Sequence, residues 1–224
     1  MSQAHPSSSG AAVVSRRRAR KRWSSTDLSL IAVFAALIAA LAIVPGIPVG
    51  ALGVPITLQT LGVMLAGVVL GPGRGGAAVG LYVLAGLAGL PIFSGFRGGL
   101  AVLAGPSAGY LIAFPLAAML AGFLATVLLR RTRRFRVGVL FIACFTASLL
   151  LIHPLGITGL VVNGGLSVGD AIAADAVFLP GDVLKNLLAA GIAAAVHRAF
   201  PRLLPRAGAA ASGHDGAEGA ARTA

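Results

Sequence analysis

Charged side chains are scarce in this chain of 224 residues. Asp, Glu, Lys and Arg together make up 11% of it, and only six residues are acidic. Soluble domains carry about 25% charged residues, whereas 57% of this sequence is hydrophobic. The composition excludes an ordinary soluble domain and predicts a membrane protein, for which the bilayer is the solvent.

Cysteine is also nearly absent, and an ATPase motif is missing. Cys144 is the single cysteine, which excludes an internal disulfide and a Cys-based metal site. No G-x-x-x-x-G-K-[ST] pattern occurs, so the chain has no ATP-hydrolysing P-loop of its own. Residues 71–76 match G-x-G-x-x-G, but no predicted strand precedes them. We therefore interpret that match as a turn.

The histidines are few and scattered, and no pair has metal-ligand spacing. No Ser, His and Asp share a plausible surface, so neither a metal site nor intramembrane enzymology is predicted. We interpret His153, which precedes Pro154, as a partner for a kinked helix backbone. His197, at the end of the last apolar run, is placed to interact with a helix dipole. No charge relay that would suggest proton coupling is visible.

Long apolar runs make up most of the sequence between its two ends. A spanning helix needs roughly 20 residues, and the first run is too long for a signal-peptide core. We predict an all-α membrane protein with six transmembrane helices, flanked by disordered tails at 1–27 and 201–224. The helices are expected at about 28–44, 53–70, 75–90, 106–129, 137–160 and 182–200.

Basic residues indicate the orientation. The block at 16–22, Arg74, the arginines at 130–136 and those at 198–206 all fall on one side of a six-span chain. The positive-inside rule then places both termini in the cytoplasm and the loops at 45–52, 91–105 and 161–181 outside. The net charge of +12 therefore reports topology, and no nucleic-acid partner is expected.

The outer loops are apolar and rich in Gly and Pro, unlike solvated loops. They are interpreted either as a lid over a site or as segments packed against the bundle. In the third loop, Ser167 and Asp170 resemble a capping box that opens a short helix at about 168–177. Asp170 and Asp175 are interpreted as solvated structural acids.

Asp182 and Lys185 are an acid and a base close together beside an apolar run. Pro180 and Gly181 suit a helix start, and residues three apart share one helix face. A charge at membrane depth costs about 2.5–3.5 kcal/mol, so the pair is predicted to form a polar site. The alternative is an ion pair that only stabilises the start of the helix.

Small residues recur every fourth position in the first run, at Ala32, Ala36 and Ala40. Such spacing allows two helices to approach closely. From these residues alone, the partner helix belongs either to the same bundle or to another membrane protein.

Five stretches together resemble the BioY family, the substrate-binding S components of energy-coupling factor (ECF) transporters. They occur in the family's order across roughly 28–200: VPITLQT at 54–60, LAGVVLG at 65–71, GLPIF at 89–93, GPSAGYL at 105–111 and FLPGDVLK at 178–185. The resemblance implies a six-helix S-component fold in the cytoplasmic membrane that binds biotin near its outer face. It also implies a transmembrane T protein and two cytosolic ATPases as partners, with Ala32, Ala36 and Ala40 facing the T protein.

The same resemblance suggests how biotin would bind. Asp182 would accept from the ureido N–H groups and Lys185 would donate to the ureido carbonyl. Candidates for the biotin carboxylate are Arg97, Tyr110 and glycine-loop N–H groups, although Lys185 could instead take that role. Gln59 is a weaker candidate, as is Thr57. Two positions depart from the family pattern: Arg97, where a small or polar residue is expected, and Ala108, where glycine is common.

Other functions stay open on the sequence. An S component for another vitamin, such as thiamine or riboflavin, is one alternative, although the single tryptophan argues against a ligand bound by ring stacking. A structural membrane protein is another, and ligand binding separates it from the transporter readings. Self-association into a homo-oligomer is a further alternative, and the partner ATPases are either dedicated to this chain or shared with other subunits.

Overall fold

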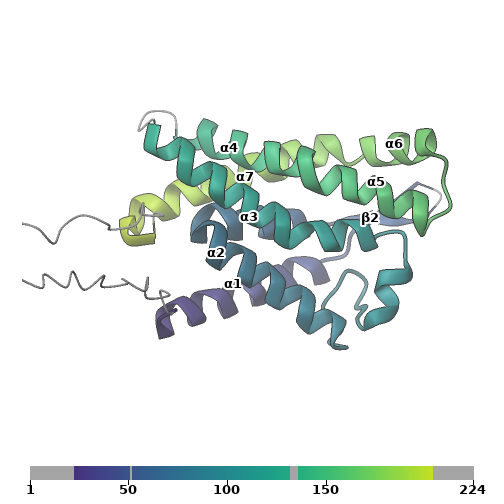
Figure 1. Cartoon of the computed structure of the whole chain (residues 1–224), viewed down its shortest axis with the longest axis horizontal. Coiled ribbons are helices and arrows are strands. Elements are labelled where there is room, and N and C mark those ends of the chain that lie inside the picture. Colours follow the sequence, from purple (N-terminus) through teal and green to yellow (C-terminus); the bar gives the residue numbers. More distant parts are fainter. Residues whose placement is uncertain (1–22, 51, 132–135, 204–224) are drawn as a thin grey trace, which may run out of the picture.

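The computed structural model describes residues 23–50, 52–131 and 136–203 (Figure 1). The basic block at 16–22, Arg133, Arg134 and most of both predicted tails lie outside the described residues. Two helical segments reach into the predicted tails: α1 already begins at Ser25, and a 3₁₀ turn covers Pro201–Leu203. Ser24 caps α1 by accepting from the Asp27 N–H.

The chain is mostly helical, which confirms the predicted class. Among the described residues, five helical segments are long and apolar enough to cross a membrane: α1, α2, α3, the continuous run Arg136–Val162 and α7. The helices are α1 (Ser25–Ile43), α2 (Gln59–Leu87), α3 (Ala108–Arg131), α4 (Arg136–Ala147), α5 (His153–Val162), α6 (Val168–Ala176) and α7 (Leu179–Ala199). Shorter helical segments are the 3₁₀ helix η1 (Leu100–Ala104), the π-helical segment η2 (Ser148–Ile152) and the 3₁₀ turn at Pro201–Leu203.

The helix α2 reverses direction at Gly71. Gly71 has φ +81°, a left-handed conformation that favours glycine, and Pro72 follows it. The amide of Gln59 donates to the Tyr82 hydroxyl at 2.6 Å, although a straight helix would separate these residues by about 35 Å. The two arms are therefore antiparallel. The turn predicted at 71–76 is confirmed, and α2 runs along the bundle in both directions.

A small hairpin departs from the all-α prediction. Strands β1 (Ile47–Val49) and β2 (Val54–Ile56) pair antiparallel, and α2 begins only at Gln59. The predicted span from 53 was therefore too long at its start. Residues 53–58 are not helical because Pro55 has no backbone N–H with which to form a helical hydrogen bond.

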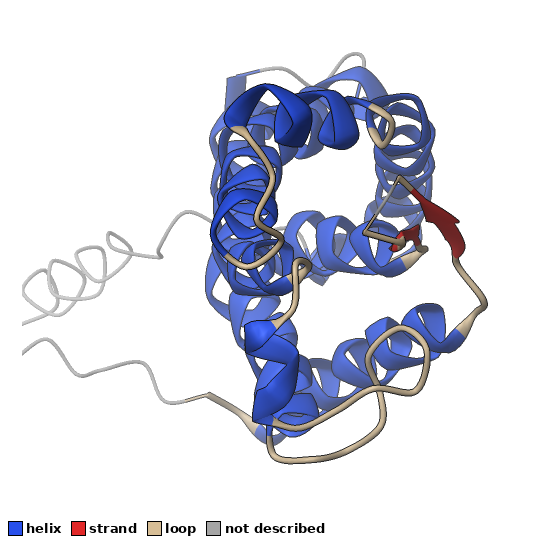
Figure 2. Cartoon of the chain, turned by 90° about the vertical axis from the view of Figure 1, so that its right-hand side faces the viewer, coloured by secondary structure: helices blue, strands red, loops and turns tan. Residues whose placement is uncertain are grey.

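The two ends of the bundle differ. At one end, Arg74 at the α2 reversal pairs with Asp27 of α1 at 3.0 Å. His197, near the end of α7, lies 3.5 Å from the Val69 carbonyl and is buried rather than exposed. The opposite end carries the hairpin, α6 and the loop at 88–107 (Figures 1 and 2). The described ends of the chain therefore lie together, away from these loops.

Small residues let the helices approach closely. Gly67 of α2 lies against the backbone of Ala118 in α3, so a side chain at position 67 would collide with it. Gly109 of α3 likewise lies against the backbone of Leu155 and Gly159 in α5. Packing through small residues is the usual means of helix association in membranes. The second contact brings the loop-side ends of α3 and α5 together.

Candidate functional site

A cleft opens at the end of the bundle that carries the loops. It encloses about 660 Å³ of empty space, part of which is open solvent. Its walls come from the β2 segment, the starts of α2, α3 and α7, and the loop at 88–107. The lining residues are Val54, Pro55, Thr57, Gln59, Thr60, Phe93, Ser94, Arg97, Val102, Ser107, Tyr110, Leu111, Phe114, Ile152, Phe178, Asp182 and Lys185. All five predicted substrate-binding residues are in this set.

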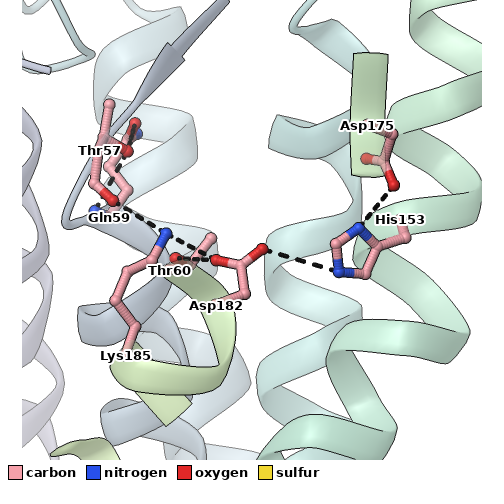
Figure 3. Close-up of polar contacts among 7 residues, drawn as sticks. All are labelled: Thr57, Gln59, Thr60, His153, Asp175, Asp182 and Lys185. Atoms are coloured by element: carbon pink, nitrogen blue, oxygen red, sulfur yellow. Dashed lines mark hydrogen bonds and ion pairs between the residues drawn. The ribbon is translucent and has the colours of Figure 1, made fainter. Parts of the chain in front are cut away.

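Asp182 and Lys185 form an ion pair in the cleft wall (Figure 3). Lys185 Nζ lies 2.6 Å from Asp182 Oδ1, and the two residues are 6% and 4% exposed. Pro180 stands in the first turn of α7, where its missing N–H costs nothing. Asp182 and Lys185 therefore share one face of α7, as predicted, and this face borders the cleft.

Two threonines extend this pair. The Thr60 hydroxyl, from the first turn of α2, donates to Asp182 Oδ1 at 3.3 Å. Lys185 Nζ donates to the Thr57 carbonyl at 3.3 Å. The pair thus ties α7 to the start of α2, because its polar atoms have partners on both sides.

Asp175 was predicted to be a solvated acid, and that prediction was wrong. Asp175 is 4% exposed, accepts from the Tyr110 hydroxyl at 2.7 Å and lies 2.7 Å from Nδ1 of His153. It shares a buried face of α6 with Ala171, one helical turn earlier. Asp170, on the other side, is exposed and bonds Ser167 in the predicted cap.

His153 was interpreted as a partner for kinked backbone, which was also wrong. Its side chain bonds Asp175, and its Nε2 lies 3.7 Å from Asp182 Oδ2 (Figure 3). The backbone distortion before Pro154 is instead accommodated by the π-helical segment η2, in which the His153 N–H bonds the Ser148 carbonyl. Nothing in the sequence indicated the row of polar side chains found here. Lys185, Asp182, His153, Asp175 and Tyr110 follow one another, with 3.7 Å and no hydrogen bond between Asp182 Oδ2 and His153 Nε2.

The other predicted residues occupy different parts of the cleft. Gln59 is buried and donates to Tyr82, while Thr57 Oγ1 donates to Gln59 Oε1 at 3.2 Å. Tyr110 lines the cleft, and its hydroxyl is already bonded to Asp175. Arg97 is exposed at the rim, where its Nε donates to the Ser94 carbonyl at 3.1 Å.

The predicted partner surface lies away from the cleft. Ala32, Ala36 and Ala40 are all exposed along one side of α1, opposite the buried face formed by residues such as Ala35 and Ile38. In the part of the chain that the structure describes, no helix packs over these three alanines.

No metal-binding arrangement appears in the described residues, since none of their His, Cys, Asp and Glu side chains form a suitable group of three or more. The cleft combines apolar walls with one ion pair and several hydrogen-bonding groups. This arrangement suits a small ligand that has an apolar body and a compact polar group.

Comparison with known proteins agrees with this site. The family model described as "BioY family" matches residues 16–202. The biotin transporter BioY of Rhizobium etli is 41% identical over 82% of this chain and 100% of its own length. That of Rhodobacter capsulatus is 42% identical over 80% and 96%.

A solved structure is also similar. The crystal structure of the S-component for biotin from an ECF-type ABC transporter aligns with a TM-score of 0.76 at 30% identity, covering 82% of this chain and all of that one. The similar fold, the family match over residues 16–202 and the identity to full-length relatives all indicate the same family. This chain belongs to the BioY family.

Proposed function

We propose that this chain binds biotin in the cleft and acts as the substrate-binding S component of an ECF-type transporter, energised by partner ATPases. The observation that carries this proposal is the buried Asp182–Lys185 pair in the wall of the cleft. The names of the full-length relatives and of the similar solved structure support the choice of biotin.

The pair has hydrogen-bonding capacity left for a ligand. An ammonium group has three N–H donors, and Lys185 directs them to Asp182 and Thr57 among the described residues. Asp182 Oδ2 makes no contact shorter than the 3.7 Å to His153 in that same set. One donor and one acceptor oxygen therefore remain, which suits the carbonyl and an N–H of a ureido group. Because an analogue without this group leaves buried polar atoms unpaired, it should bind much more weakly.

The remaining parts of biotin have candidate partners. The apolar walls, with Phe93 and Phe178, would cover the thiophane ring and the valeryl chain. Arg97 is the candidate for the carboxylate because it is a cation at the cleft rim. Tyr110 is a poorer candidate, since its hydroxyl already donates to Asp175.

Arg97→Gln tests the assignment of the carboxylate. We expect it to weaken binding of biotin and to leave binding of biotinamide, which has no carboxylate, nearly unchanged. Arg130→Gln, an exposed cation at the other end of the bundle, is the control. If Arg97→Gln weakens both ligands equally, Arg97 does not bind the carboxylate.

The proposed topology has six membrane spans and both termini in the cytoplasm. The reversal of α2 supports it, as does the position of Arg74 and Arg136 at the end where α1 begins and α7 ends. Ser24 and Ser167 are exposed at opposite ends, and the native Cys144 is buried. A membrane-impermeant maleimide applied to intact cells should label Ser167→Cys and spare Ser24→Cys; the reverse pattern would invert the topology.

The partners proposed are a transmembrane T protein and two cytosolic ATPases. The exposed small-residue side of α1 would receive the T protein, because it lets a second helix approach closely. The absence of a P-loop motif from the sequence fits ATP hydrolysis by other subunits. Transport would then require tilting of the whole bundle within the complex.

The deciding experiment measures binding of biotin to the purified, detergent-solubilised chain, with thiamine and riboflavin as competitors. Saturable binding that only biotin competes for supports the proposal. Competition by another vitamin would reassign the substrate. No binding by a sample with a cooperative thermal transition would refute the transporter function and leave Asp182 and Lys185 as structural charges.

A further inference from the structure

A chain of polar groups continues from the cleft wall into the protein. Behind Asp182 lie His153 of α5, Asp175 of α6 and Tyr110 of α3, and the first two are 5% and 4% exposed. His153 does not line the cleft, although the preceding Ile152 does. Any effect of His153 on a ligand must therefore pass through cleft residues, either Asp182, which the ring faces, or Tyr110, which it reaches through Asp175.

The imidazole lies between two carboxylates (Figure 3). Its Nδ1 is 2.7 Å from Asp175 Oδ2, and its Nε2 is 3.7 Å from Asp182 Oδ2, without a hydrogen bond in the described structure. A neutral imidazole has one N–H and can donate to only one of these groups. Its other nitrogen would then direct a lone pair at a carboxylate. The protonated ring has an N–H for each of them.

The net charge of the buried groups around His153 also favours a protonated imidazole. The groups that face His153 are Tyr110 from α3, Asp175 from α6, and Asp182 and Lys185 from α7. Two carboxylates and one ammonium leave a buried net charge of −1 when the imidazole is neutral, and zero when it is protonated. An uncompensated buried charge is costly, so the geometry favours the protonated ring.

We infer that His153 is a positioning residue, that its protonated form holds the Asp182 carboxylate in place for substrate, and that substrate binding is therefore linked to a proton. This inference rests on the proposed function, because biotin is the ligand whose binding reports the linkage. The mechanism is electrostatic and requires no proton transfer to the substrate.

The direction of the linkage follows from two effects. When His153 loses its proton, Asp182 Oδ2 loses its cationic neighbour and is free to turn away from the cleft. The cluster also becomes negative, which opposes the biotin carboxylate. Both effects weaken binding as pH rises, and protonation of His153 restores it at lower pH. Linked sites usually change one another's affinity by about 5- to 150-fold.

The experiment is a series of biotin-binding measurements on the full chain between about pH 5.5 and 9, where imidazole titrates while ordinary carboxylates and lysines keep their charges. We expect wild-type affinity to fall at least about fivefold across this range. His153→Gln keeps an amide donor but does not titrate, so its affinity should be lower at acidic pH and nearly independent of pH. His197→Gln, which replaces a buried histidine at the other end of α7, should keep the wild-type profile.

A second variant tests the same linkage without removing the histidine. Asp175→Asn takes away the carboxylate on Nδ1, so His153 should lose its proton at a lower pH and the affinity should begin to fall earlier. Asp170→Asn, an exposed acid on the same helix, is the matched control and should have no effect. A titrating His153 requires that both control variants, His197→Gln and Asp170→Asn, keep the wild-type pH profile and that His153→Gln loses it.

The outcomes separate this inference from the proposed function. Biotin binding that is equal at every pH, or a wild-type pH profile retained by His153→Gln, refutes the proton linkage and leaves the proposed function intact. A folded sample that binds no biotin at any pH refutes both. A fall with rising pH that His153→Gln abolishes supports the inference.

Discussion

Breaking the Asp182–Lys185 pair should destabilise the protein strongly, because both charges are buried. Removing one partner of a buried ion pair typically costs about 3–5 kcal/mol, since the other charge is left uncompensated. For a chain of this size, 1 kcal/mol shifts the melting temperature by about 2–4 °C. We therefore expect Asp182→Asn or Lys185→Met to lower the Tm by roughly 6–20 °C.

The two single variants should differ. Without Lys185, Asp182 keeps the Thr60 hydroxyl and the nearby His153 as partners. Without the Asp182 charge, Lys185 keeps the Thr57 carbonyl, a neutral acceptor. Asp182→Asn should therefore be the more destabilising of the two.

The double variant separates a binding role from a structural one. Asp182→Asn combined with Lys185→Met removes both charges, so it should recover part of the Tm lost in the single variants. It should still bind biotin poorly, because the ureido partners are gone. Thermal unfolding in detergent and biotin titration of the same four samples provide the two readouts.

The control is the ion pair between Arg74 and Asp27. These side chains are 23% and 20% exposed, and such pairs are worth about 0.2–1 kcal/mol. Arg74→Gln should therefore leave biotin binding unchanged and shift the Tm only slightly. If the double variant at 182 and 185 binds biotin as the wild type does, the assignment of the pair to the substrate is refuted.

Two further predictions concern packing. Gly156→Ala would bring a methyl group onto the ring of Tyr110, so we expect weaker biotin binding in a titration, whereas Gly138→Ala, where the added methyl meets nothing, should bind normally. Ala36→Leu on the exposed side of α1 should leave biotin binding intact but reduce uptake by cells that also express the T protein and ATPases. Ala195→Leu, an exposed position on α7, should not reduce uptake; equal loss in both variants would refute the proposed T-protein surface.

The helices and the central ion pair were predictable from the sequence because their signals are local. Long apolar runs identify the helices, and the spacing of Asp182 and Lys185 places both on one helical turn. The turn at Gly71 was predictable as well, since Gly and Pro interrupt an apolar run there. The hairpin was missed because its strands have three residues each and contain prolines, so no alternating pattern is visible.

The polar groups behind the cleft could not be predicted because they depend on tertiary structure. His153 and Asp175 are separated by 22 residues and meet only because α6 turns one face onto the end of the bundle. The sequence contains only a weak local signal that Asp175 is buried. Ala171 and Asp175 are four residues apart and share a face of α6, where Ala171 is small. An exposed acid with the same spacing would look identical in the sequence.

Helix direction provides the last link between the fold and the proposed ligand. The cleft lies at the N-terminal ends of α2, α3 and α7, with Thr60, Tyr110 and Asp182 in or near their first turns. Each N-terminus carries unpaired N–H groups and a partial positive charge of about +0.5. No residue from the C-terminal turns of α1, α2 or α5 lines the cleft in the described structure. The backbone therefore offsets the negative charge of the buried carboxylates and favours an anionic ligand, even before Arg97 at the rim is counted.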